Sequence, residues 1–169
     1  MLPKRSILVV LGALVVLALV QNLWYWTELP VRVATHFNAQ GRPNGWMSRD
    51  SAVLTMLLFQ IGMPVFLVGL GAIISRVPPH MLNVPNREYW CQPERVGQVR
   101  SHSINMLGQI AALTSLLLLG VNHLTFLANI KAQPLDTRWS TILLAVFLGA
   151  ICAIIARMYL HFRVPPSDA

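Results

Sequence analysis

Two histidines, His36 and His123, have the side chains best suited to chemistry in this sequence. His36 lies with Asn38 in a polar connection between two apolar stretches, and His123 lies near the end of the third such stretch. Two imidazoles can bind Zn²⁺ or Cu²⁺, and a carboxylate from Glu28 or Asp50 would complete such a site. Alternatively, His36 fixes a turn and His123 hydrogen-bonds a neighbouring helix. The residue types leave both interpretations open.

Signatures of the common enzyme classes are absent from the sequence. It contains no His-Glu-x-x-His, no phosphate loop, no Gly-x-Gly-x-x-Gly and no Gly-x-Ser-x-Gly. The two cysteines, Cys91 and Cys152, do not form a Cys-x-x-Cys pair. We therefore expect a protein without a cofactor that is not an enzyme. A metal-dependent enzyme that uses His36 and His123 is the alternative.

Four long apolar segments must position these side chains. The chain has 169 residues, of which 55% are hydrophobic and 11% charged, and its mean hydropathy is +0.57. A helix needs about 20 apolar residues to cross a bilayer. We predict an all-α membrane protein, a single domain over residues 1–169 built as a four-helix bundle. Its expected spans are about 6–27, 51–75, 104–130 and 139–160. Stretches free of charged residues fill most of these spans, which argues against a proton-driven transporter.

The basic residues predict how the chain is oriented in the membrane. Lys and Arg outnumber Asp and Glu by 13 to 6, but without a basic block, so we expect no nucleic-acid partner. Eight of the 13 Lys and Arg residues lie near the two termini and in the connection 76–103, and five lie in the other connections. Basic residues favour the cytoplasmic side. We therefore expect both termini in the cytoplasm and the connection 28–50 outside.

Both long connections have patterns of folded structure. Within 28–50, apolar and polar residues alternate from Val31 to Asn38, which predicts a short extended cap closed by turns. Gly41 and Gly45 are expected in those turns at positive φ. Within 76–103, we expect Pro93 in the first turn of the helix that continues into the third span, with Glu94 favouring its dipole.

Two motifs in these connections resemble a known family. Leu29–Trp46 reads Leu-Pro-x-Arg-Val-x-Thr-His-Phe-Asn-x-x-Gly-x-Pro-x-Gly-Trp, and Leu82–Arg95 contains Leu-Asn-x-Pro-Asn-x-x-Tyr-Trp and Pro-Glu-Arg. Both are similar to the bacterial membrane domain of unknown function 1648, the N-terminal domain of SdpI-type immunity proteins. The resemblance implies a bacterial cytoplasmic membrane and a module that binds a peptide or another membrane protein. The candidate ligand-binding residues, besides His123, are then His36, Asn38, Gly41, Gly45, Trp46, Asn83, Pro85, Asn86, Tyr89, Trp90, Glu94 and Arg95.

The fourth span carries small residues at four-residue spacing, namely Ala145, Gly149 and Ala153. Small residues let membrane helices approach closely. The stripe is expected to contact either the rest of the bundle or another protein. Three functions remain open: a partner-binding module, an accessory subunit of a larger membrane complex, and the metal-dependent enzyme.

Overall fold

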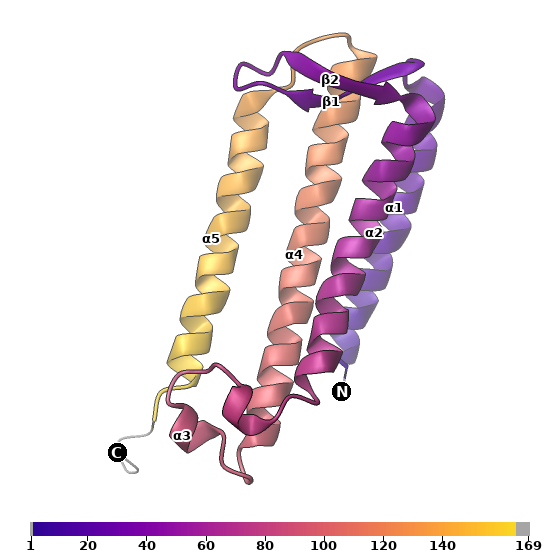
Figure 1. Ribbon diagram of the computed structural model, residues 1–169. Coiled ribbons are helices and arrows are strands. Elements are labelled where there is room, and N and C mark those ends of the chain that lie inside the picture. Colours follow the sequence, from indigo (N-terminus) through magenta and orange to yellow (C-terminus); the bar gives the residue numbers. More distant parts are fainter. Residues whose placement is uncertain (1, 165–169) are drawn as a thin grey trace.

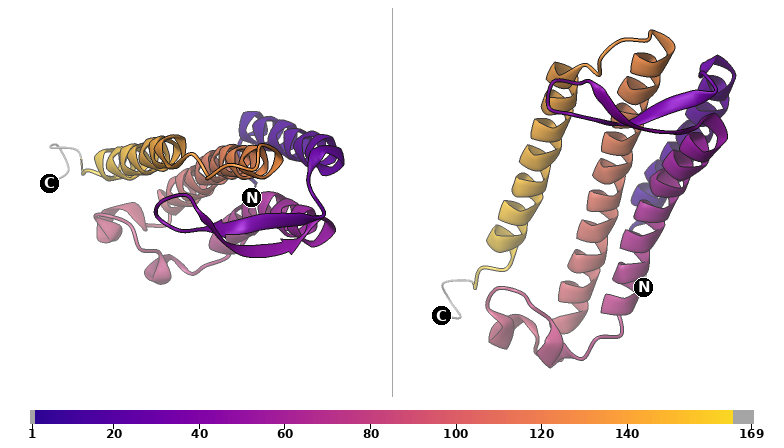
Figure 2. Two further views of the ribbon diagram at one scale, coloured as in Figure 1. Left: turned by 90° about the horizontal axis from the view of Figure 1, so that it is seen from above. Right: turned by 45° about the horizontal axis from the view of Figure 1, so that its top comes forward.

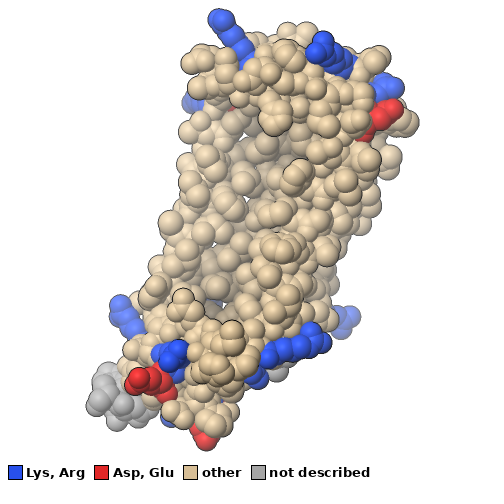
Figure 3. Space-filling model, in the orientation of Figure 1, with Lys and Arg blue, Asp and Glu red and all other residues tan. Residues whose placement is uncertain are grey.

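The computed structural model describes residues 2–164 and consists mainly of four long helices that run side by side (Figure 1). These are α1 (Arg5–Glu28), α2 (Arg49–Ile74), α4 (Val96–Ile130) and α5 (Thr137–His161). Each is long and apolar enough to cross a membrane. The lysines and arginines visible on the face in Figure 3 lie near the two ends of the bundle and leave the middle uncharged. The expected helical fold is therefore confirmed, and its four apolar helices indicate a multi-pass membrane protein.

Helix α4 is the central helix of the bundle. It packs against α1, α2 and α5, and Figure 2 shows α5 beside it on one side, with α1 and α2 toward the other. Small buried residues allow the close contacts: a Cβ added to Gly108 would lie 2.8 Å from Ile7 Cγ2. No residue of α5, all of which is described, is buried. Helix α5 is therefore the most weakly enclosed element of the bundle.

A two-stranded hairpin covers one end of the bundle, which we call the hairpin end. Strands β1 (Arg32–Phe37) and β2 (Pro43–Ser48) pair antiparallel, which confirms the predicted extended cap. Val33 is fully buried in a cluster with Phe126 of α4. At the tip, the Leu135 backbone N–H donates to the Gly41 carbonyl oxygen (2.8 Å). The hairpin is thus attached both to α4 and to the α4–α5 connection.

Glycine is needed at the two hairpin positions, 41 and 45, for different structural reasons. Gly41 has a φ of +74°, as predicted, and a Cβ there would collide with the Leu135 carbonyl oxygen. The prediction for Gly45 was wrong, because Gly45 belongs to β2, pairs with His36 and is not among the residues at positive φ. A Cβ on Gly45 would instead lie 3.1 Å from both Cβ and Cδ2 of His36. Gly45 therefore makes room for the imidazole.

The opposite end of the bundle, which we call the terminal end, is closed by the α2–α4 connection. It contains a short 3₁₀ helix, η1 (Pro79–Met81), and one turn of helix, α3 (Arg87–Trp90). The expectation for Pro93 was wrong, because α4 begins at Val96 and Pro93 and Glu94 precede it. They form a separate turn, closed by the Arg95 backbone N–H donating to the Gln92 carbonyl oxygen (3.0 Å). Glu94 therefore lies before the first turn of α4.

Candidate functional site

Four amide side chains form a polar cluster between α1, α2 and α4. Gln60 Nε2 donates to Gln21 Oε1 (2.9 Å), and Asn22 Nδ2 donates to Gln60 Oε1 (2.6 Å). Asn122 Nδ2 approaches Gln21 Oε1 at 3.2 Å and Asn22 Oδ1 at 3.4 Å. Interhelical hydrogen bonds of this kind hold membrane helices together. Sequence reasoning missed Gln60, although a single glutamine in the apolar stretch 51–75 was a signal for it.

His123 lies on the periphery of the bundle, whereas its neighbour Asn122 is buried. Its Nδ1 is 2.7 Å from the Tyr25 hydroxyl of α1, and the Tyr25 ring packs edge-on against Phe126. The hydrogen bond fixes the orientation of the imidazole ring. This bond agrees with the alternative drawn from the sequence, in which His123 hydrogen-bonds a neighbouring helix.

His36 is exposed on β1, and its packing partner is Gly45 of β2. The contact of His36 with Gly45 and that of His123 with Tyr25 share no residue. Asp50, a possible third ligand, accepts a hydrogen bond from Trp26 Nε1 (2.8 Å). Within residues 2–164, no three His, Cys, Asp or Glu side chains lie close enough to hold a metal ion.

The remaining residues of the first motif stabilise the hairpin. Asn38 Oδ1 accepts from the backbone N–H groups of Gln40 and Arg42, at 3.1 and 2.9 Å. Such a turn brings β1 round into β2. The Trp46 ring lies under the Arg32 guanidinium, 5.1 Å from its centroid. These motif residues therefore build the cap.

Residues of the second motif secure the end of α5. Asn86 Nδ2 and Trp90 Nε1 both donate to the Phe162 carbonyl oxygen, at 2.7 and 2.9 Å. Asn86 has a φ of +52°, and the Arg95 guanidinium lies 4.0 Å from the Tyr89 ring centroid. The other members, Asn83, Pro85 and Glu94, lie at or near the surface. The second motif thus anchors α5 to the terminal end.

A first cavity lies between α4 and α5 at the hairpin end, and we call it the hairpin-end cavity. Its volume is about 460 Å³. Apolar side chains such as Leu124, Leu127 and Leu143 line it together with His123 and Trp139. Lys131 and Asp136 contribute one charge of each sign. Volumes of about 300–1,000 Å³ are typical of ligand pockets.

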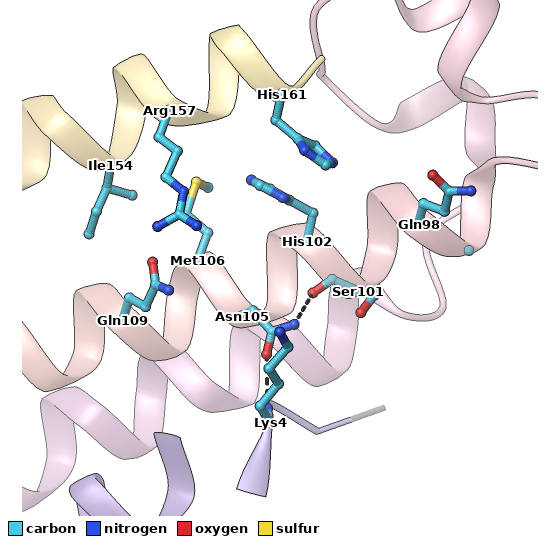
Figure 4. A pocket seen from close by; sticks show the side chains of 11 residues that line it. Lys4, Gln98, Ser101, His102, Asn105, Met106, Gln109, Ile154, Arg157 and His161 are labelled. Atoms are coloured by element: carbon cyan, nitrogen blue, oxygen red, sulfur yellow. Dashed lines mark hydrogen bonds between the residues drawn. The ribbon is translucent and has the colours of Figure 1, made fainter. Parts of the chain in front are cut away.

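A second cavity, the terminal-end cavity, lies between α4, α5 and the residue before α1, and has a volume of about 470 Å³. Figure 4 shows the side chains around it, with His102 and His161 facing one another from α4 and α5. Sequence reasoning missed this site. The signal was a polar stripe at helical spacing along α4, made of Gln98, His102, Asn105 and Gln109.

Residues 13–61 match the family model described as Domain of unknown function (DUF1648). The match covers most of α1, the hairpin and the first half of α2, and it includes the first motif. The predicted resemblance to this domain is therefore confirmed. No curated protein and no solved structure matches the chain.

Proposed function

We propose that this chain is a non-enzymatic membrane module that binds a peptide, or an exposed segment of another membrane protein, at the hairpin end. In this proposal it resides in the bacterial cytoplasmic membrane with both termini in the cytoplasm, so that the hairpin end faces outward. The resemblance of the two motifs to SdpI-type immunity proteins implies binding of a peptide or another membrane protein, which agrees with this role.

The hairpin-end cavity is the observation that carries the proposal. Its apolar wall of leucines suits an apolar side chain, and Trp139 adds an aromatic surface. Lys131, Gln133 and Asp136 offer charged and amide groups to the backbone or charges of a bound segment. A cavity with an apolar lining and a few polar groups is typical of a binding site. The combination favours an amphipathic ligand.

The contact of His123 with Tyr25 gives the cavity a positioned polar group. The ring lines the cavity, and its Nδ1 lies 2.7 Å from the Tyr25 hydroxyl, which orients the ring. The other ring nitrogen, Nε2, is not used by this contact and can hydrogen-bond a bound segment. His123 therefore contributes an oriented hydrogen-bonding group to the cavity wall.

Two adjacent leucines on α5 provide a test. Leu143 lines the cavity, whereas Leu144 is 49% exposed and is not one of its lining residues. Cells producing the wild-type chain, Leu143→Trp or the control Leu144→Trp are challenged with a panel of membrane-active peptides. We expect the wild type and Leu144→Trp to protect against at least one peptide and Leu143→Trp to lose that protection. Equal survival of both variants, or no protection by the wild type, would contradict the proposal.

The exposed face of α5 favours a second candidate function, that of an accessory subunit. Of the two contacts expected for the small-residue stripe, its exposure favours the one with another protein: Ala145, Gly149 and Ala153 are all exposed. A Cβ on Gly149 would meet no atom within 4 Å. The stripe is therefore available to a helix of another protein. Gly149→Leu should then abolish stable co-purification with that subunit, whereas Leu148→Ala on a neighbouring exposed position should not.

A further inference from the structure

We propose that the terminal-end cavity binds the phosphate-bearing headgroup of an anionic phospholipid. The acyl chains of that lipid would lie in an apolar groove that continues from the cavity between α1, α4 and α5. The proposal is independent of the peptide binding proposed at the hairpin end.

The terminal-end cavity is lined by basic side chains without a balancing acid. Lys4, His102, Arg157 and His161 line it, and among its described lining residues none is Asp or Glu. Within residues 2–164, the ion pair of the structure is Arg49 with Asp50 at the hairpin end (3.8 Å). The charges of Lys4 and Arg157 are therefore not neutralised by a carboxylate of the described chain. A cavity of this kind attracts an anion.

Backbone and side-chain contacts hold Lys4, His102 and His161 around the cavity. The Lys4 backbone N–H donates to Asn105 Oδ1 (2.8 Å), and Asn105 Nδ2 donates to the Ser101 carbonyl oxygen (2.8 Å). These bonds hold the residue before α1 against α4. On the other side, the rings of His102 and His161 stack with centroids 4.3 Å apart and planes at 15°. Contacts from three elements thus converge on one opening.

An apolar groove adjoins the cavity and gives it the shape of a lipid site. The groove has a volume of about 420 Å³ and shares Gln109, Ile154 and Arg157 with the cavity. Its other lining includes Ile7, Val10, Leu113 and Leu116. A ligand that fills both spaces must have an anionic head and an apolar tail. Free phosphate would occupy the cavity only.

The depth of the basic groups agrees with the headgroup level of a bilayer. At 1.5 Å per residue, α1 and α5 are about 36 and 38 Å long, slightly more than the roughly 30 Å hydrocarbon core. Lys4 precedes α1, and Arg157 lies one turn before the end of α5. Both therefore lie near the interface, with the groove on the hydrocarbon side. Basic pockets between membrane helices commonly bind anionic headgroups at this depth.

Native mass spectrometry of the detergent-purified chain tests the proposal. The probes are dioleoylphosphatidylglycerol, dioleoylphosphatidylcholine and inorganic phosphate. We expect one phosphatidylglycerol to bind about tenfold more tightly than phosphatidylcholine. Lys4→Gln/Arg157→Gln should remove this preference, whereas Arg42→Gln/Arg138→Gln, which loses the same charge at the hairpin end, should keep it. Equal binding of the two lipids to the wild type would overturn the proposal, as would equal effects of the two double variants.

A second variant keeps every basic group and tests the location. Ile154→Trp fills the junction of cavity and groove, and Ile155→Trp adds the same ring at a position that is 43% exposed. We expect Ile154→Trp to lose phosphatidylglycerol binding and Ile155→Trp to retain it. Full binding by Ile154→Trp would place the lipid elsewhere and overturn the assignment. If inorganic phosphate displaces bound phosphatidylglycerol at an equal concentration, the cavity takes a free anion and the lipid assignment fails.

Discussion

The side chain of Asn129 pairs with both backbone polar groups of Ala34. Asn129 Oδ1 accepts from the Ala34 N–H (2.6 Å), and Asn129 Nδ2 donates to the Ala34 carbonyl oxygen (2.9 Å). An asparagine of α4 thereby takes the place of a neighbouring strand beside β1. Because Ala34 is only 5% exposed, these groups have little access to water. This pairing fixes the hairpin on the end of the central helix.

Replacing Asn129 with leucine should therefore loosen the cap. Asn129→Leu leaves the Ala34 N–H and carbonyl oxygen without this partner, and an unpaired buried polar group costs about 1–3 kcal/mol. Thermal unfolding in detergent should show a lower midpoint, and cleavage of the hairpin by an added protease should accelerate. Asn83→Leu, at an exposed position of the other connection, is the matched control and should change neither measurement.

Alanine substitutions should distinguish the two hairpin glycines. Gly41→Ala should cost more than about 1 kcal/mol, because a residue with a Cβ is disfavoured at positive φ and would also collide with Leu135. Gly45→Ala should be destabilising in the wild type and much less so in a His36→Ala background, because the imidazole is the obstacle. Both effects are measured by the unfolding midpoints of Gly41→Ala, Gly45→Ala, His36→Ala and the double variant His36→Ala/Gly45→Ala. Equal effects of Gly45→Ala in the two backgrounds would refute the steric explanation.

The buried amide cluster should contribute measurably to helix association. Gln60→Leu removes the donor to Gln21 and the acceptor for Asn22. Hydrogen bonds between membrane helices average about 0.6 kcal/mol and reach about 1.7 kcal/mol, so we expect a loss in that range per bond. Reversible unfolding in mixed micelles measures it. Phe59→Leu, on the preceding exposed position of α2, should leave the free energy of unfolding unchanged.

His36 and His123 should act independently. The Tyr25 bond of His123 and the Gly45 contact of His36 share no residue, and effects of sites without shared partners usually add to within about 0.5 kcal/mol. The stability losses of His36→Ala and His123→Ala should therefore sum to that of the double variant. A double variant whose stability loss differs from this sum by more than about 0.5 kcal/mol would instead indicate a shared site. So would a zinc ion that raises the unfolding midpoint of the wild type but not of either single variant.

The membrane orientation is open to a direct test. The excess of basic residues at the terminal end predicts that this end is cytoplasmic, since eight of the 13 Lys and Arg residues lie there. A reporter that is active only in the cytoplasm should be active when fused after the last residue and inactive when inserted at Gln40. The reverse pattern would invert the proposed topology and place the hairpin end inside the cell.

The sequence by itself determined the elements of the fold. Apolar stretches free of charge specify membrane helices, because an unpaired backbone or a charge is costly in hydrocarbon. Alternation in 31–38 likewise specified the strand, since side chains alternate between the two faces of a strand. These signals are local, and each can be recognised within a few neighbouring residues.

Only the tertiary structure decided which side chains meet. Gln21, Gln60 and Asn122 come from three helices, and their hydrogen bonds depend on the rotation of each helix about its axis. Lys4, His102 and Arg157 likewise form one cavity only because the start of α1 and the end of α5 lie beside the same stretch of α4. In these nearly uniform apolar helices, the packing of small residues such as Gly108 sets that rotation and placement. Because such packing depends on contacts between distant segments, periodicity along the chain does not reveal it.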